Sequence, residues 1–160
     1  MEGVISNYLS KKLLDHALGI ASYTMPETIY VGLASSTATA SQLAAGTLTN
    51  EITDYDGNRK AITMGAAALE DSQDALSDMI SAGGTQEIIF EDMPACTVAW
   101  VLLCDAATSG NVLFALPLVV LEEGENYLDP DPKEVAAGET FRLPVGNVIA
   151  FIGQRAATAA

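Results

Sequence analysis

The nine residues 96–104 limit the possible folds of this chain more than any other segment. Their sequence, Cys-Thr-Val-Ala-Trp-Val-Leu-Leu-Cys, is apolar at nearly every position. Alternate side chains of an extended strand point to opposite faces, so Val98 and Trp100 are expected on one face, and Val101 and Leu103 on the other. A strand that is apolar on both faces is typical of the middle of a sandwich or of a position beneath a partner subunit.

The residues after this strand predict that it is one half of a β-hairpin. Residues 105–111 read Asp-Ala-Ala-Thr-Ser-Gly-Asn, and they combine short polar side chains with a glycine that can adopt a positive φ. The apolar run 112–116 follows and would return alongside the first strand. The hairpin carries no catalytic signature, so we interpret it as the structural centre of the fold.

A single helix is predicted near the N-terminus, over residues 6–18. Ser6 or Asn7 can cap its start, and Gly19 is suited to end it. His16 lies near the C-terminal end, where the helix dipole favours the protonated imidazole, and we interpret it as a capping or solvent-facing residue. The apolar side chains expected on one helix face are Leu9, Leu13, Leu14, Ala17 and Leu18.

The rest of the chain has the pattern of short strands separated by turns. Residues 35–49 are small and polar without periodicity, which favours a surface loop or a partner-binding segment. Residues 70–84 favour a short helical or irregular excursion, and the acidic stretch 122–139 favours a solvated loop or a docking loop for a basic surface. The expected strands besides the hairpin are 28–34, 60–67, 86–93, 118–121, 140–144 and 148–152.

Short strands without βαβ alternation favour antiparallel sheets. We therefore predict an all-β fold, an antiparallel β-sandwich of the jelly-roll type with one short N-terminal helix. The chain has 160 residues, which is enough for one domain with a substantial core. Within this single domain the helix would occupy residues 1–19, the sandwich 26–153 and a small-residue tail 154–160.

The charge balance argues against nucleic-acid and membrane partners. The chain has 7 Lys and Arg residues against 21 Asp and Glu residues, with a formal net charge of −14. The cations are scattered along the sequence, so a phosphate backbone or an anionic bilayer would repel the surface. We find no signal-peptide pattern and no apolar run long enough to cross a bilayer, so synthesis in a cytosol is expected.

Residue types that carry catalysis or bind cofactors are scarce. The single histidine excludes histidine-rich metal sites, and the sequence contains no phosphate-binding glycine loop, dinucleotide motif or Gly-x-Ser-x-Gly motif. Cys96 and Cys104 are expected at the two ends of one strand, too far apart for a disulfide, as buried small hydrophobic residues. We therefore predict that the protein is not an enzyme and has no catalytic residues, no cofactor and no metal.

Two weaker alternatives use acidic residues. Asp54, Asp56 and Asn58 alternate as calcium ligands do, but the glycine and glutamate of a full calcium-binding loop are missing at the sixth and twelfth positions. A tight Asp-Gly turn is the simpler interpretation. Asp129 and Asp131 could serve a carbohydrate-active sandwich, but nothing in the sequence marks them as an acid–base pair.

Several motifs resemble those of a family of small virion proteins of tailed bacteriophages, known as tail-fibre-like or head-decoration proteins. The most specific motif is the Asp-Ala-Ala-Thr-Ser-Gly-Asn turn at 105–111, which follows an apolar strand. The resemblance covers residues 4–152 and departs from the family pattern at 70–84 and 122–136. Its other matching segments are 6–9, 12–19, Pro26, 29–33, Tyr55, 59–63, Phe90, Trp100, 112–114 and 138–146.

The resemblance implies a non-enzymatic structural protein of the phage particle. The leading expectation is a capsid decoration (cement) protein on the phage head, made in the host bacterial cytoplasm. Its partners would be the major capsid protein and further copies of itself, and repeated weak contacts would gain strength through avidity. The alternative is a tail-fibre or baseplate-associated component. The residues expected in subunit contacts are Tyr8, Leu9, Lys12, Leu43, Leu48, Tyr127 and Arg155.

Overall fold

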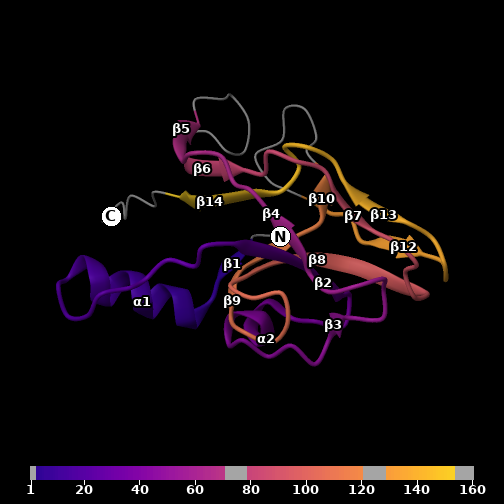
Figure 1. The fold of residues 1–160 in the computed structure, drawn as a ribbon, viewed down its shortest axis with the longest axis horizontal. Coiled ribbons are helices and arrows are strands. Elements are labelled where there is room, and N and C mark those ends of the chain that lie inside the picture. Colours follow the sequence, from indigo (N-terminus) through magenta and orange to yellow (C-terminus); the bar gives the residue numbers. More distant parts are fainter. Residues whose placement is uncertain (1–2, 71–78, 121–128, 154–160) are drawn as a thin grey trace, which may run out of the picture.

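The computed structural model describes residues 3–70, 79–120 and 129–153. Strands dominate it, the strand pairs in these three ranges are antiparallel, and the two helices are short, so the predicted all-β antiparallel fold is confirmed. The elements in chain order are β1 (Val4–Ile5), α1 (Asn7–Ala17), β2 (Ile29–Ser35), α2 (Ala40–Ala44), β3 (Glu51–Ile52), β4 (Lys60–Ile62), β5 (Ala68–Glu70), β6 (Met79–Gly83), β7 (Ile88–Phe90), β8 (Cys96–Cys104), β9 (Val112–Pro117), β10 (Val119–Val120), β11 (Asp129–Pro130), β12 (Lys133–Val135), β13 (Phe141–Leu143) and β14 (Ile149–Gly153) (Figure 1).

The largest sheet is built around the predicted hairpin. β8 lies at its centre between β9 and β2, and the strand order is β1–β9–β8–β2–β3. β12 pairs with the first residues of β8, and β4 pairs with the first residues of β2. Smaller sheets formed by β10–β11, β7–β13 and β5–β6–β14 complete the described part of the fold.

β8 buries side chains on both faces, as its sequence predicts. Val98, Val101 and Leu103 belong to one buried cluster, whereas Trp100 and Leu102 belong to a second. None of these five residues is more than 4% exposed. The central strand therefore separates two cores, one on each face of the large sheet.

The face predicted for Val98 is wrong. We expected Val98 to share a face with Trp100, but the two side chains lie in different clusters. The cause is a β-bulge: Ala34 of β2 pairs with Trp100, and the next residue, Ser35, pairs with Val98. Ala99 therefore has no partner on β2, and one extra residue reverses the in–out alternation of the strand.

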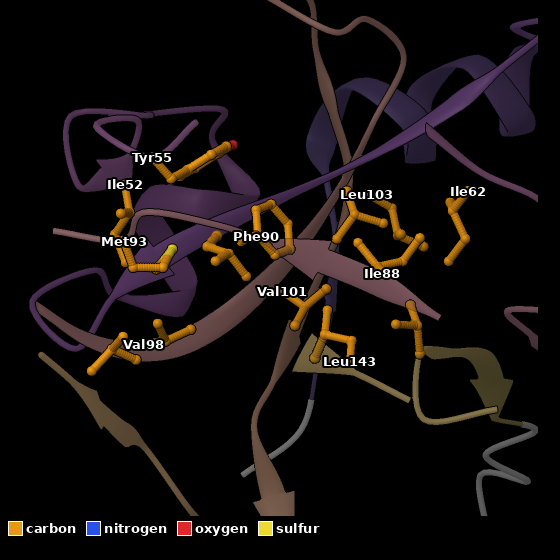
Figure 2. Close-up of a cluster of buried hydrophobic side chains, with 14 residues drawn as sticks. Ile52, Tyr55, Ile62, Ile88, Phe90, Met93, Val98, Val101, Leu103 and Leu143 are labelled. Atoms are coloured by element: carbon orange, nitrogen blue, oxygen red, sulfur yellow. The ribbon is translucent and has the colours of Figure 1, made fainter. Parts of the chain in front are cut away.

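The first core joins β8 and β2 to the small β7–β13 pair. Phe90 of β7 is fully buried, and Figure 2 shows it near the middle of the cluster. Its ring meets the ring of Tyr55 edge to face, with centroids 4.9 Å apart and an angle of 81° between the ring planes. This geometry is the favourable one for two aromatic quadrupoles, so the pair adds to the stability that burial alone provides.

The second core is covered by α2, a helix where we expected a loop over residues 35–49. Thr39 and Gln42 form a capping box: the Thr39 hydroxyl accepts from the Gln42 N–H, and the Gln42 side chain accepts from the Thr39 N–H. Leu43 is fully buried, and Trp100 Nε1 donates to the Ala38 carbonyl at 3.2 Å. A helix of five residues is too short to show a 3.6-residue repeat, which is why periodicity missed it.

Two other segments differ from their predictions. In the region where we expected a helical or irregular excursion, β6 pairs along its length with β14, while residues 71–78 of that region lie outside the described residues. The predicted strand 60–67 stops at Ile62, because Met64 bridges to Gly84 and the chain leaves β2 there. In both places a partner strand that is distant in sequence decides the local structure. The predicted tail, 154–160, also lies outside the described residues.

Candidate interaction surfaces

The helix α1 and the segment after it form a helical arm (residues 7–28) at one side of the molecule (Figure 1). Leu9 is the only buried residue of this arm. The apolar face predicted for the helix is therefore mostly uncovered: Leu14 is 61% exposed and Leu18 is 65% exposed. Ile20 and Met25, which follow the helix, are also exposed, so four large apolar side chains face solvent within twelve residues.

Local hydrogen bonds define both ends of α1. The Ser6 hydroxyl accepts from the Leu9 N–H at 3.1 Å, as expected for an N-cap. Gly19 adopts a φ of 71°, its N–H donates to the His16 carbonyl, and the Ile20 N–H donates to the Asp15 carbonyl. This is the Schellman arrangement, so the predicted helix start and helix end are both confirmed.

His16 ties the arm together. Its Nδ1 accepts a hydrogen bond from the Tyr23 N–H at 3.1 Å, which folds the segment after the helix back onto the helix. The exposed His16 side chain therefore links α1 to the segment after it, which is close to the capping role expected from the sequence.

Two lysines lie beside the apolar residues of the arm, balanced by Asp15 and Glu27. Lys11 forms an ion pair with Asp15 one helical turn later, and the Lys12 ammonium lies 5.8 Å from the centre of the Tyr8 ring. Lys11, Leu14 and Leu18 follow one another at intervals of three and four residues, so they lie along one stripe of the helix. The arm thus combines an apolar stripe with cations in a chain whose net charge is −14.

A cleft of about 490 Å³ opens between the β9–β10 segment, β12, β13 and the turn before β14. Its walls are largely apolar, with Val101, Leu116, Leu118, Phe141, Leu143 and Val148 among the lining residues. Asp131, Lys133, Arg142 and Asn147 supply the polar side chains of the lining. Lys133 pairs with Asp131, and Arg142 lies 3.5 Å from Glu87, so the cations at the cleft have acidic neighbours.

A buried ion pair supports the hairpin turn. Arg59 Nε and Nη2 donate to the two carboxylate oxygens of Glu51 at 2.6 and 2.8 Å, and Arg59 Nη1 donates to the carbonyls of Ala106 and Ser109. The hydrogen bond to Glu51 is the largest of the effects that raise the pKa of Arg59 above its ordinary value. One guanidinium therefore joins the β3 strand to the turn that carries the family resemblance.

The turn itself is closed by Asp105 and Asn111. The Asp105 carboxylate accepts from the Asn111 N–H at 2.6 Å and from its side-chain amide at 2.8 Å. Ser109 and Gly110 both have positive φ, as the sequence predicts for the glycine. A Cβ added at Gly110 would lie 2.4 Å from the Asp105 carboxylate, so only glycine fits there.

The structure separates the residues that we expected in subunit contacts into three groups. Tyr8, Lys12 and Leu48 lie at or near the surface, and their contacts with a neighbouring subunit stay a prediction. Leu9 and Leu43 are at most 5% exposed, so their side chains serve the fold within the chain. Tyr127 and Arg155 lie outside the described residues.

The weaker alternatives gain no support from geometry. Within residues 3–70, 79–120 and 129–153, no group of three or more His, Cys, Asp or Glu side chains could hold a metal ion. The turn proposed for calcium, with Asp54, Asp56 and Asn58, brings the Lys60 ammonium to 2.6 Å from the Asp56 carbonyl. Asp129 lies in a two-residue strand paired with β10, at an exposed position.

Burial disfavours the thiolate form of both cysteines. Burial raises the pKa of Cys104 to about 12 and also raises the pKa of Cys96. A thiolate is the reactive form of cysteine, so these side chains are poor nucleophiles near neutral pH. Cys104 is buried, as the sequence predicts, whereas Cys96 is only partly buried.

The sequence did not predict the exposed apolar residues after the helix in the helical arm, nor the cleft. Ile20 and Met25 were not singled out, although apolar residues after a helix-ending glycine are a signal for an uncovered segment. The cleft depends on segments that are far apart in the sequence, such as Leu116 and Phe141, so no local pattern could indicate it.

An uncovered apolar arm and an apolar cleft are typical of a protein that makes contacts with other molecules. A family model described as "Podophage GP4 fiber I protein gp80" matches residues 4–150. The chain therefore belongs to this family of phage virion proteins, which confirms the resemblance. None of the curated proteins matches the chain. Among the described helices, none is long and apolar enough to cross a membrane.

Proposed function

We propose that this protein is a structural component of a podophage fibre and has no catalytic role. The observation that carries the proposal is the family match over residues 4–150, a range that includes the helical arm and the cleft. The family description names a fibre. It therefore supports the tail-fibre alternative better than the cement protein that we expected first.

A structural role agrees with the chemistry of the described residues. Burial raises the pKa of the thiols of Cys96 and Cys104, and the one described ion pair buried on both sides, Arg59 with Glu51, has its partners inside the fold. The most prominent surface features that do not serve the fold itself are two apolar surfaces, the arm and the cleft. Exposed apolar surface of this kind is characteristic of protein contacts.

The proposal predicts where the protein lies on the intact particle. Gold-labelled antibodies raised against the purified protein should decorate fibres in electron micrographs of the phage that encodes it. Particles assembled without the protein serve as the control for background labelling. Label spread over the head surface, with recovery of the protein on purified tailless heads, would overturn the fibre assignment and favour a cement protein bound to the major capsid protein.

A further inference from the structure

The helical arm is a folded segment with very little support from its own chain. α1 has 11 residues and only Leu9 is buried, whereas isolated helices shorter than about 12–15 residues are marginal in water. Its exposed stripe carries two large apolar side chains, Leu14 and Leu18, beside Lys11. A helix of this kind gains most of its stability by covering its apolar face, so the arm is built to be covered in the assembled state.

The same chain offers an apolar concavity elsewhere. The cleft of about 490 Å³ has Leu116, Leu118 and Phe141 in its walls and lies within the size range of protein binding pockets. Figure 1 shows α1 at one side of the molecule, while β10 and β13, which border the cleft, lie towards the other side. The arm therefore extends from the molecule on the side away from β10 and β13.

We propose that the helical arm of one copy of this protein docks in the cleft of a second copy. The contact joins two different surfaces, so it is heterologous, and each copy keeps one free arm or one free cleft for a further neighbour. Leu14, Leu18, Ile20 and Met25 supply the apolar side chains of the arm. The lining of the cleft supplies the receiving surface.

Charge favours this pairing over other contacts between two copies. Each copy carries a net charge of −14, so most pairs of surfaces repel. Of the seven Lys and Arg residues, Arg155 lies outside the described residues, and four of the other six lie on the arm or in the cleft lining: Lys11, Lys12, Lys133 and Arg142. The acidic residues are Asp15 and Glu27 on the arm and Asp131 in the cleft lining, so neither surface carries an excess of negative charge.

Sedimentation velocity of the purified full-length protein over a range of concentrations tests the proposal. The wild-type protein should form species larger than a dimer as its concentration rises. Raising the salt from about 0.05 M to about 0.5 M NaCl should strengthen the association, because salt screens the repulsion between acidic copies and leaves apolar contacts intact. A protein that stays monomeric at every concentration and salt level would overturn the proposal, as would an association that salt weakens.

Two variants test the two surfaces separately. The arm variant, Leu18→Gln with Ile20→Gln, should weaken association by about tenfold or more for each apolar side chain removed from the contact. The cleft variant, Val119→Trp with Asn147→Trp, fills the cleft from a half-buried and an exposed position and should have the same effect. The control is Leu69→Gln in β5, because Leu69 is 60% exposed but lies on neither surface. Circular dichroism verifies that each variant is folded.

A mixture of the two variants distinguishes this contact from a symmetric one. The arm variant keeps its cleft and the cleft variant keeps its arm, so an equimolar mixture should form a one-to-one dimer and nothing larger. If the cleft variant instead associates as the wild type does and only the arm variant is monomeric, the arms pair with each other and the proposal is wrong. This proposal rests on the proposed fibre function, but its test uses the isolated protein. A negative sedimentation result can therefore be distinguished from a negative labelling result on phage particles.

Discussion

Arg59 and Glu51 form a two-point ion pair inside the protein, with side chains that are only 4% and 9% exposed. The remaining donor of the guanidinium satisfies two carbonyls of the hairpin turn, at Ala106 and Ser109. One side chain thus joins Glu51, eight residues away, to a turn that lies about fifty residues further along the chain. A polar pair is suited to this buried place, because the carbonyl groups of the turn need a hydrogen-bond donor that a hydrophobic side chain could not supply.

Replacing Arg59 should strongly destabilise the fold. Arg59→Ala leaves the Glu51 carboxylate buried without its partner and should lower the free energy of unfolding by about 3–5 kcal/mol in a urea titration. Arg142→Ala is the matched control, because Arg142 pairs with Glu87 at an exposed position and should change the free energy by less than about 1 kcal/mol. Equal losses in the two variants would contradict a structural role for the buried pair.

The Gly110→Ala variant separates backbone strain from steric clash. Its φ of 69° costs about 1–2 kcal/mol for a residue with a Cβ, and the new Cβ would also lie 2.4 Å from the Asp105 carboxylate. Gly46→Ala has a similar φ of 79° but no atom within 4 Å of the new Cβ, so it should show the strain alone. The urea midpoint should therefore fall further for Gly110→Ala, and equal shifts would show that the clash is relieved without cost.

The N-cap of α1 should contribute a measurable part of the stability. Ser6→Ala removes the acceptor for the Leu9 N–H at a position that is only 1% exposed, and should cost about 1 kcal/mol. Ser10→Ala, in the middle of the same helix, is the control and should be neutral or slightly stabilising, because alanine has the higher helix propensity. Thermal unfolding followed by circular dichroism measures both. A smaller loss for Ser6→Ala than for Ser10→Ala would contradict the cap.

Stability should fall at alkaline pH. Burial raises the pKa of Cys104 from 9.0 to about 12, and burial together with the Glu51 charge raises the pKa of Tyr55 from 10.0 to about 12. Both groups are neutral acids in the fold, so their contribution is fully present below the unfolded values and is lost as pH rises through 9–12. The loss approaches about 1.4 kcal/mol per pH unit for each group in that window.

Urea titrations at several pH values between 8 and about 11 measure this loss. Tyr55→Phe removes the titrating hydroxyl and keeps the ring against Phe90, so it should flatten the decline above pH 10. An unchanged slope in that variant would show that Tyr55 ionises equally in the folded and unfolded protein.

How far the sequence predicts this structure depends on how local the deciding interactions are. Short sequence patterns predict the hairpin, the capped N-terminal helix and the positive φ at Gly110, and all three are confirmed. α2 has a local signal too, the capping box of Thr39 and Gln42, but it lies in a small polar segment that lacks periodicity. A search for capping boxes in addition to periodicity finds it.

Other features depend on partners that the sequence does not reveal. The same apolar spacing is found in a helix that packs on its own chain and in a helix that packs on another molecule. The exposure of Leu14 and Leu18 could therefore not be predicted. The pairing of Arg59 with Glu51 has no sequence signature beyond two opposite charges eight residues apart. The cleft arises only where β9, β12 and β13 meet.

The bulge at Ala99 makes the length of β8 more important than the exact side chains along it. The residues before and after the bulge alternate out of phase, so that Val98 serves one core and Trp100 the other. A one-residue deletion or insertion there would move the side chains of one half of the strand to the opposite face of the sheet. An exchange of one aliphatic side chain for another changes only the local volume. This stretch of the gene should therefore accept substitutions while it rejects insertions and deletions.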